Sequence, residues 1–437
     1  MRSGLVTIGK FGRDRLARVF QRLPLSARII GPPKGYYGSF NAYTQAVHDG
    51  LADKWPVIAA ESLNLRAPST IDARYLPIFQ PLRHESPELG LYRIQEGRFH
   101  RDARTILTKD DRILSSFSAW MGRGPQDNWL FKKLWLGPLH RYSGKSLLLV
   151  GHWNYYHFLI EEMPRIWFAK EAGFEISDFD HFIMFSPIHA STRVVCERLD
   201  IKKEKIIPLE KVPHVECEEF YFTSGPWYYG QTFALRARDF LLSLSQSAKT
   251  CHGRRIYISR ERRGHGKISN ENELFQELAL IGFEKVTPEA LSFDEQIATF
   301  QQAEWIIGAH GAGLTNVIFS RPGCKLIEIR NPTYDANETY QTRGGNIFWR
   351  LSEFLGLDYE AFFASPNDTE IWVPGGGVPE IVRLPNLTVD VDSFMTFLSF
   401  LQERPGESTS IDANSFGTDR PTHSPDCHRR STRIQTP

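Results

Sequence analysis

Residues 305–331, WIIGAHGAGLTNVIFSRPGCKLIEIRN, restrict the fold more than any other stretch of the chain. Residues 305–308 have the length and the apolar composition of a buried strand. A glycine-rich turn follows at 308–313, and 314–319 has the pattern of a short helix that a Pro-Gly pair ends. Residues 324–329 then return as a second strand. The order strand, turn, helix, strand is typical of an open α/β sheet.

The chemistry of this turn suits an anion. Backbone N–H groups at a turn that opens a helix, together with the helix dipole, bind phosphate or diphosphate. Gly311 and Gly313 would let the main chain approach the anion without an intervening Cβ. Glu328 comes at the end of the next strand, where a carboxylate could bind the two hydroxyls of a ribose. We therefore predict a nucleotide-sugar site here.

Predicted strands and helices alternate on both sides of a polar break at 245–253. In the first series we expect strands at 147–150, 182–185, 206–209 and 219–223, and helices at 152–165, 191–199 and 231–247. In the second we expect strands at 255–259, 283–286, 305–308 and 324–329, and helices at 270–281, 292–303, 346–355 and 392–401. Ser292 and Glu295 form a capping-box pattern at the start of one of these helices.

We predict four regions. Residues 1–35 form a basic segment, 36–247 and 248–403 form two α/β domains, and 404–437 form a Ser/Thr/Pro-rich tail that should be disordered. Within the first domain, residues 32–135 are rich in Pro, Gly and Arg. We expect an irregular, strand-containing lead-in there and assign it no topology.

The composition indicates which partners and which cellular compartment the protein is suited to. The 437 residues suffice for two domains, and a net charge of +1 gives no drive toward nucleic acid. The five cysteines include no C-x-x-C pair, so neither a disulfide framework nor a zinc site is indicated. We find no secretory signal and no apolar run of membrane-spanning length, and we expect a cytoplasmic protein.

The basic segment 1–35 supports two interpretations. Leu16, Val19, Phe20 and Leu23 keep the spacing of an amphipathic helix. Such a helix among arginines can attach weakly to the inner face of an anionic membrane. An ordinary N-terminal helix packed on the protein has the same pattern, and the sequence does not decide between the two.

Other phosphate motifs fail. The dinucleotide fingerprint G-x-G-x-x-G would need a small residue at its last position, where the chain has Asn316. It also has an acid about 20 residues further on, and Glu328 follows the turn more closely than that. The Gly-Lys pair at 266–267 lacks the first glycine of a P-loop, where Glu261 stands, and has Ile268 in place of Ser or Thr. G-x-S-x-G and H-E-x-x-H are absent from the sequence.

Cations cluster after the predicted strand 255–259. Arg260 comes first, and Arg262, Arg263, His265 and Lys267 follow. Ligands bind at this edge of an open α/β sheet, so these side chains could neutralise a leaving diphosphate without a metal. A solvated basic loop is the alternative. His310, inside the glycine turn, could donate to the phosphate or could be structural.

The predicted helix 152–165 supplies candidates for a base. Asn154, His157 or Phe158, Glu161 and Arg165 lie near one face by their i, i+3, i+4 spacing. Glu161 could orient the imidazole of His157. We expect Pro164 to limit the regular helix to the turns before it. The alternative is that Asn154 caps the helix and His157 belongs to the core.

Three stretches together resemble glycosyltransferase family 61: GHWNYYHFLIEEMPR at 151–165, YISRERRGHGKISNENEL at 257–274, and IGAHGAGLTN at 307–316 with LIEI at 326–329. The family includes bacterial capsular-polysaccharide biosynthesis proteins, plant xylan-decorating transferases and animal O-linked N-acetylglucosaminyltransferases. The resemblance covers residues 147–331. It implies a GT-B fold, in which two Rossmann-like domains face a cleft, and inverting transfer from a nucleotide sugar, commonly a UDP-sugar.

Carried over by position, the resemblance makes Arg260, Lys267, Gly311, Gly313, Thr315 and Asn316 donor-site residues, and places Asn154, His157 and Glu161 on the acceptor side. Relatives often carry arginine where this chain has Lys267. The choice of base among His157, Glu161 and Glu162 stays open. The predicted catalytic residues are His157, Glu161 and Asn154, and the predicted donor-binding residues are Arg260, Arg263, Lys267, His310, Gly311, Gly313, Leu314, Thr315, Asn316 and Glu328.

The leading hypothesis is an inverting glycosyltransferase of surface or capsular polysaccharide biosynthesis. It would need no metal or other cofactor and would act on a saccharide or lipid-linked saccharide acceptor. A non-catalytic sugar- or nucleotide-binding protein on the same fold is the alternative. A nicotinamide-dependent enzyme is disfavoured by Asn316.

Overall fold

The structure is a computed structural model. It describes residues 16–17, 19–23, 26–48, 50–70, 72–80, 82–118, 124–149, 154–187, 189–224, 238–246, 253–262, 264–332, 346–367, 371–375, 378–383 and 385–403. The predicted tail at 404–437 and the side chain of Arg263 lie outside these residues.

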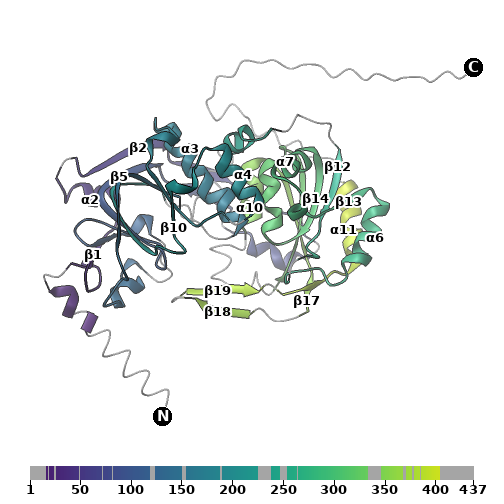
Figure 1. The fold of residues 1–437 in the computed structure, drawn as a ribbon. Coiled ribbons are helices and arrows are strands. Elements are labelled where there is room, and N and C mark those ends of the chain that lie inside the picture. Colours follow the sequence, from purple (N-terminus) through teal and green to yellow (C-terminus); the bar gives the residue numbers. More distant parts are fainter. Residues whose placement is uncertain are drawn as a thin grey trace, which may run out of the picture. The chain divides into compact units, whose positions relative to one another are not determined.

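The second series of elements builds a parallel sheet. Its strands are β12 (Arg254–Ile258), β13 (Phe283–Val286), β14 (Ala303–Ala309), β15 (Lys325–Arg330) and β16 (Asp358–Phe363). Among the described residues they pair in the order β13-β12-β14-β15-β16, every pair parallel. Strands β12, β13 and β14 are labelled in Figure 1. The chain therefore turns one way from β12 to β13 and the other way from β14 onward, as in a doubly wound sheet.

Helices cover both faces of this sheet. Apolar residues of α6 (Glu271–Leu280) and α11 (Val391–Glu403) share one cluster with Tyr257, whereas those of α7 (Phe293–Gln302) and α10 (Ile347–Leu355) share another with Ile256 and Ile258. Alternate side chains of a strand point to opposite faces, which explains this division. The predicted capping box of α7 is confirmed: the Ser292 N–H donates to Glu295 over 2.7 Å.

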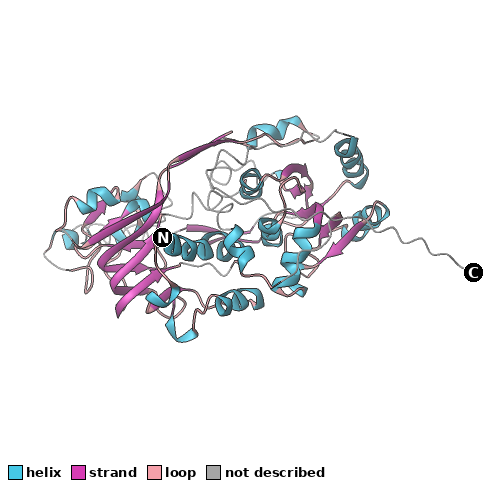
Figure 2. Cartoon of the chain, turned by 90° about the horizontal axis from the view of Figure 1, so that it is seen from above, coloured by secondary structure: helices cyan, strands magenta, loops and turns pink. Residues whose placement is uncertain are grey.

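The first series joins a larger mixed sheet. Its long strands are β5 (Leu89–His100), β8 (His140–Leu148) and β11 (His214–Thr223). The order is β1-β7-β6-β5-β11-β8-β9-β10, with β2 also on β5. Figure 2 draws the strands in magenta. The shorter strands are β1 (Gly35–Tyr37), β2 (Ala52–Ile58), β6 (Thr105–Leu107), β7 (Arg112–Leu114), β9 (His181–Met184) and β10 (Ile206–Pro208). Strands β11, β8, β9 and β10 are parallel neighbours, and β5 joins β11 antiparallel.

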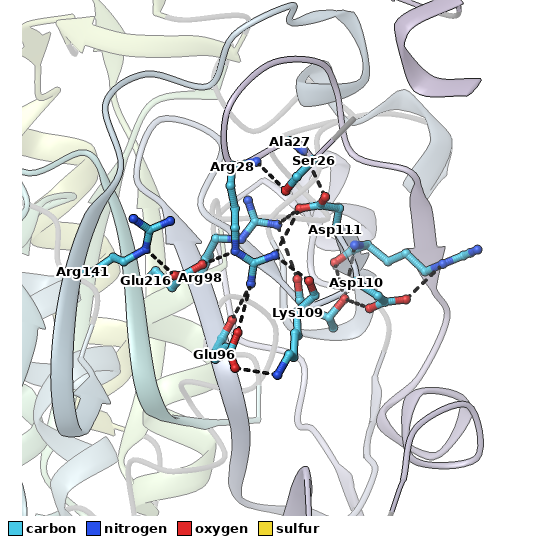
Figure 3. Close-up of polar contacts among 12 residues, drawn as sticks. Ser26, Ala27, Arg28, Glu96, Arg98, Lys109, Asp110, Asp111, Arg141 and Glu216 are labelled. Carbon is cyan, nitrogen blue, oxygen red and sulfur yellow. Dashed lines mark hydrogen bonds and ion pairs between the residues drawn. The ribbon is translucent and has the colours of Figure 1, made fainter. Parts of the chain in front are cut away.

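The stretch 32–135 contains strands, as expected, but it is not an irregular lead-in, because its strands β1, β2, β5, β6 and β7 belong to this sheet. Strand β5 contains Arg98, which breaks the apolar pattern expected of a buried strand. The Arg98 side chain is nevertheless completely buried, because its guanidinium pairs with Asp111 (Figure 3). A charge with a buried partner is compatible with a core position, and the sequence alone does not reveal the partner.

The remaining elements are short. They are α2 (Phe40–Thr44), α3 (Met163–Glu171), α4 (Ala190–Arg198), and the paired strands β3 (Glu61–Asn64) with β4 (Arg83–Ser86), β17 (Ser365–Pro366) with β20 (Leu387–Thr388), and β18 (Ile371–Gly375) with β19 (Val378–Arg383). Of the predicted helix 231–247, residues 238–243 are helical and 231–237 lie outside the described part. None of the described helices is both long and apolar enough to cross a bilayer.

One apolar cluster includes side chains from both sheets. Leu147 and Ile160 of the first series belong to the same cluster as Ile306 and Val317 of the second. An ion pair between Arg198 of α4 and Asp294 of α7 adds a polar contact between the two series. The predicted division at 247/248 stays a prediction, since residues 247–252 are outside the described part.

Candidate active site

The site forms where the strand order reverses, between β12 and β14. Ligands of open α/β sheets bind beyond the carboxyl ends of the strands at such a switch point. Arg260 lies two residues after β12, and the glycine turn directly follows β14. The parallel register pairs Ile258 with Gly308, so these two segments leave the sheet side by side.

Arg260 lies directly over Gly311. A Cβ built on Gly311 would fall on the Arg260 guanidinium, with the carbon Cζ only 2.6 Å away. Gly311 also has a φ of +150°, which residues with a side chain rarely adopt. The Arg260 Nε donates to the carbonyl of Gly266 over 2.7 Å, which anchors the guanidinium to its own loop. The structure thus brings together the two predicted parts of an anion site.

Lys267 belongs to the same loop. Its backbone N–H donates to Asn386 Oδ1 over 3.1 Å, and its carbonyl accepts from the N–H of Leu387 over 2.8 Å. The backbone on which Lys267 stands is therefore fixed. The contact of the Lys267 side chain with the donor stays a prediction.

The helix after the turn, η9 (Ala312–Phe319), is a 3₁₀-helix. Two glycines have a packing role here: a Cβ on Gly308 of β14 would lie 2.9 Å from Leu314 Cδ2, and one on Gly313 of η9 would lie 3.3 Å from Ile258 Cγ2. Leu314 is completely buried. Gly308 and Gly313 therefore allow η9 to pack closely on β12 and β14. The absence of a side chain at Gly313 would also let an anion approach the backbone N–H groups of the turn.

Thr315 and Asn316 are completely buried in η9. The Asn316 amide donates from Nδ2 to Gln296 Oε1 over 2.8 Å and accepts at Oδ1 from the Tyr155 hydroxyl over 2.9 Å. The Thr315 hydroxyl has no hydrogen-bond partner in the part of the chain that the structure describes. Asn316 is thus committed to protein contacts, and its predicted contact with the donor stays a prediction.

His310 is held by a buried carboxylate. Its Nδ1 lies 2.5 Å from Glu328 Oε1, and its backbone N–H donates to Ile329. Glu328 is completely buried and also accepts from the Tyr359 hydroxyl over 2.5 Å. The guanidinium of Arg330 lies 3.4 Å from the same carboxylate. The partners of Glu328 are protein side chains, and its predicted contact with a ribose stays a prediction.

The charge of Glu328 follows from these partners. Burial raises the pKa of its carboxyl, but the positive charge of Arg330 and the contacts with His310 and Tyr359 outweigh burial, so that this pKa lies below its ordinary value. The ionised carboxylate can only accept hydrogen bonds, so Nδ1 of His310 carries a proton. Burial and the charge of Glu328 raise the pKa of the Tyr359 hydroxyl, which stays protonated.

The second group of predicted residues lies on a helix that begins with a π-helical segment, η5 (His157–Glu162), and continues as α3. Nδ1 of His157 lies 2.7 Å from Glu161 Oε2, which confirms that the two side chains meet. π-Helical turns often occur at functional sites. The imidazole keeps part of its surface exposed, whereas Glu161 is nearly buried.

The predicted end of the helix near Pro164 is wrong. Helix α3 runs on to Glu171, with Pro164 in its first turn. Pro164 lies where the helix changes from π-helical to α-helical, one residue after Met163, whose N–H donates to the carbonyl of Phe158.

The other members of this helix have distinct surroundings. Asn154 is exposed, and its Oδ1 accepts from the Tyr156 N–H over 2.8 Å, as in the capping alternative. Glu162 is almost fully buried. The buried Arg165 donates to the carbonyls of Glu161 and Leu148, and burial lowers the pKa of its guanidinium to about 10 despite the nearby carboxylates.

Two aromatic side chains that the sequence analysis did not single out connect the His157 helix to the glycine turn. Tyr155 reaches Asn316 through its hydroxyl. The ring of Phe348 packs edge-on against Tyr156 at 5.8 Å and against His310 at 5.5 Å. Tyr155 and Arg330 lie inside or beside the quoted motifs, which is the signal that could have identified them. Nothing in the local sequence marks Phe348 or Tyr359.

Among the described residues, no group of three or more His, Cys, Asp or Glu side chains is arranged to hold a metal ion.

Residues 155–327 match the family model Glycosyltransferase 61. No curated protein matches the chain significantly. The matched segment begins at Tyr155, contains Arg260 and the glycine turn, and ends one residue before Glu328. The resemblance noted in the sequence is confirmed. A domain of this family implies an enzyme that transfers a sugar from a donor to an acceptor.

Proposed function

From the glycosyltransferase 61 domain that this chain carries at 155–327, we propose an inverting transfer of a sugar from a nucleotide donor to a saccharide acceptor. The donor would be a UDP-sugar, and the acceptor a growing surface or capsular polysaccharide. The observation that carries the proposal is the position of the Arg260 guanidinium over Gly311 at the switch point of the sheet.

The donor diphosphate would bind between the turn and the basic loop. Backbone N–H groups of the turn face the phosphates, and Arg260 donates two parallel hydrogen bonds to them. Lys267 adds a second positive charge. His310 would donate from Nε2 when protonated, and Glu328 compensates the resulting charge. These groups stabilise the negative charge that develops as the sugar–phosphate bond breaks, and we propose that they do so without a metal.

The acceptor would approach from the helix that begins at Tyr155. Here His157 removes the proton of the attacking hydroxyl, and Glu161 orients its imidazole from 2.7 Å. The hydroxyl oxygen forms a bond with C1 of the sugar on the face opposite the diphosphate, which leaves with the bonding electron pair. One displacement inverts the anomeric configuration. The contact between Tyr155 and Asn316 supports this pairing of donor and acceptor sides.

We further propose a GT-B-like arrangement, in which 36–247 supplies the acceptor side and 248–403 the donor side. The parallel sheet β12–β16 supports a nucleotide-binding half, and binding of both substrates would close the halves around the reacting groups.

A thermal-shift screen of the full chain against UDP-, GDP- and CMP-sugars, with and without Mn²⁺, tests the donor. We expect stabilisation by a UDP-sugar without Mn²⁺, and donor hydrolysis or transfer by the wild type. Arg260→Ala should lose the shift, whereas His157→Ala should keep the shift and lose turnover. Binding without turnover in the wild type would indicate a non-catalytic protein, and binding of NAD(P) instead would overturn the proposal.

A further inference from the structure

Apolar side chains gather on the surface near the N-terminus, away from the proposed catalytic groups. Val19 is 55% exposed, Ile29 is 75% exposed and Trp135 is 60% exposed. Leu16, Leu23 and Ile30 are exposed as well. We call these six residues the N-terminal apolar patch. They lie on three segments, namely the described residues of 16–23, which are helical up to 22, the turn at 26–30 and the chain at 134–135.

Gly31 brings the three segments together. Its backbone N–H donates to the carbonyl of Leu134 over 2.7 Å, so that Ile30 and Trp135 are neighbours of this hydrogen bond. A Cβ on Gly31 would lie 3.7 Å from the Cβ of Phe20, which places the helix against the same residue. Lys34 donates to the carbonyl of Gln21 over 3.3 Å and also to that of Leu23, which holds the end of the helix.

The helix shows its apolar face to solvent. Ala17 is buried and Phe20 is partly buried, whereas Leu16, Val19 and Leu23 are exposed and keep the i, i+3, i+7 spacing of one face. If the helix packed on the protein through its apolar face, these three residues would be buried. The structure therefore favours the first of the two interpretations that the sequence left open.

The turn is fixed by buried charges. The N–H of Ala27 donates to Asp111 over 3.0 Å, and the guanidinium of Arg28 pairs with Glu216 (Figure 3). Arg28 also donates to the carbonyl of Lys109 over 2.6 Å. With Arg28 held against the sheet, the following Ile29 and Ile30 point to solvent. Their exposure is thus a property of a rigidly attached turn.

Cations accompany the patch. Arg22 is exposed on the helix, and the sequence of residues 1–35 contains eight Lys or Arg and one Asp, although five of these cations lie outside the described residues. Lys132 and Lys133 are exposed close to Trp135 along the chain. Tryptophan and aliphatic side chains insert at the boundary of a bilayer, and neighbouring Lys and Arg are attracted to anionic lipid head groups.

We propose that the N-terminal apolar patch docks this protein peripherally on an anionic lipid bilayer. Two copies of the chain facing each other through this patch would oppose like charges, which argues against self-association there. The docking does not depend on the transfer chemistry, and its failure would leave the proposed activity intact. If both hold, the enzyme would work beside a lipid-linked acceptor.

Vesicle flotation of the full chain tests the proposal. We expect binding to phosphatidylcholine vesicles that contain phosphatidylglycerol, and weak binding to phosphatidylcholine alone. Ile29→Ser and Trp135→Ala should each weaken binding about tenfold, because each removes an inserted apolar group. Arg22→Glu with Lys132→Glu should weaken binding to the anionic vesicles and leave the residual binding to phosphatidylcholine unchanged.

Leu280→Ser is the matched control, because Leu280 is 79% exposed on α6 and outside the patch. Its binding should equal that of the wild type. All variants change exposed side chains, so equal thermal unfolding will confirm their folding. Equal binding of the patch variants and the wild type would overturn the proposal. So would a wild type that binds no vesicle, or patch variants that shift a dimer to a monomer in size-exclusion chromatography.

Discussion

The Nδ1 of His310 lies 2.5 Å from the carboxylate of Glu328, which is completely buried and also contacts Tyr359 and Arg330. His310 is partly exposed and sits in the glycine turn. An imidazole with one nitrogen fixed in this way can present only the other nitrogen to a ligand. Glu328 is thus a positioning residue for His310 within the proposed donor site.

Glu328→Gln should lower the rate of sugar transfer about ten- to hundredfold, because it replaces a charged hydrogen-bond partner of His310 by a neutral one. His310→Ala should lower it similarly, and the double variant should show no further loss, because both changes act through one group. The measurement is kcat and KM with the donor that the screen identifies.

Tyr359→Phe is the control for this prediction. It removes the hydroxyl that donates to Glu328 and accepts from Arg330 Nη1 over 3.0 Å, but it leaves the contact of Glu328 with His310. It should therefore cost about 1–3 kcal/mol of stability and little activity. Additive losses in the double variant would show that Glu328 acts independently of His310.

Gly311→Ala should weaken binding of UDP about tenfold or more, since the new Cβ displaces the Arg260 guanidinium. It should also cost about 1–3 kcal/mol of stability, because alanine is strained at a φ of +150°. Gly323→Ala is a matched control: its φ is +82°, but no atom lies within 4 Å of the new Cβ. Calorimetric titration with UDP that finds equal weakening in both variants would contradict the prediction.

Tyr155→Phe should destabilise the protein by about 1–3 kcal/mol, because it leaves Oδ1 of the buried Asn316 without the tyrosine hydroxyl. Urea unfolding of Tyr155→Phe, Asn316→Ala and the double variant should give a coupling energy of about 1 kcal/mol. Tyr36→Phe, on an exposed tyrosine, should change stability by less than about 0.5 kcal/mol. A coupling energy of zero would mean that the contact contributes nothing to joining the two series.

Variants of the His157 helix should identify the base. His157→Ala should lower kcat about 10²- to 10⁴-fold without weakening donor binding. Glu161→Gln should have a smaller effect in the same direction, since Glu161 orients the imidazole from 2.7 Å. Glu162→Gln should leave kcat nearly unchanged. If Glu162→Gln lowered the single-turnover rate more than His157→Ala does, Glu162 and not His157 would be the base.

His214 should make stability depend on pH. Burial, aided by the nearby His100 and Arg98, lowers the pKa of its imidazole to about 3. Between pH 6.5 and pH 3 the unfolded chain binds a proton that the folded protein does not, so stability is fully present above pH 6.5 and falls as pH decreases. Urea unfolding at pH 7 and pH 5 should show that His214→Gln loses about 2 kcal/mol less than the wild type. Equal losses would show that His214 is protonated in the folded state.

Much of the site could be predicted from local sequence. The strand before Arg260, the glycine turn and the contact between His157 and Glu161 each depend on residues a few positions apart. Periodicity, turn chemistry and helix spacing act over this range, which is why a single sequence reveals them.

Contacts between distant residues were not predictable in this way. Tyr155 meets Asn316 across 161 residues, and Tyr359 meets Glu328 across 31. The sequence proposed Glu328 as a ribose ligand, and only the structure shows that it is completely buried and contacts His310, Tyr359 and Arg330. Arg98 likewise makes the sequence of β5 look too polar for a buried strand, and only its ion pair with Asp111 explains its burial.

The sequence by itself determined which segments end in phosphate-suited turns and which side chains share a helix face, because those properties arise from neighbouring residues. Only the tertiary structure decided that β12 lies beside β14, so that Arg260 covers Gly311, and that a buried carboxylate holds His310. Strand order and side-chain pairing depend on how the whole core packs, and no local pattern encodes that packing.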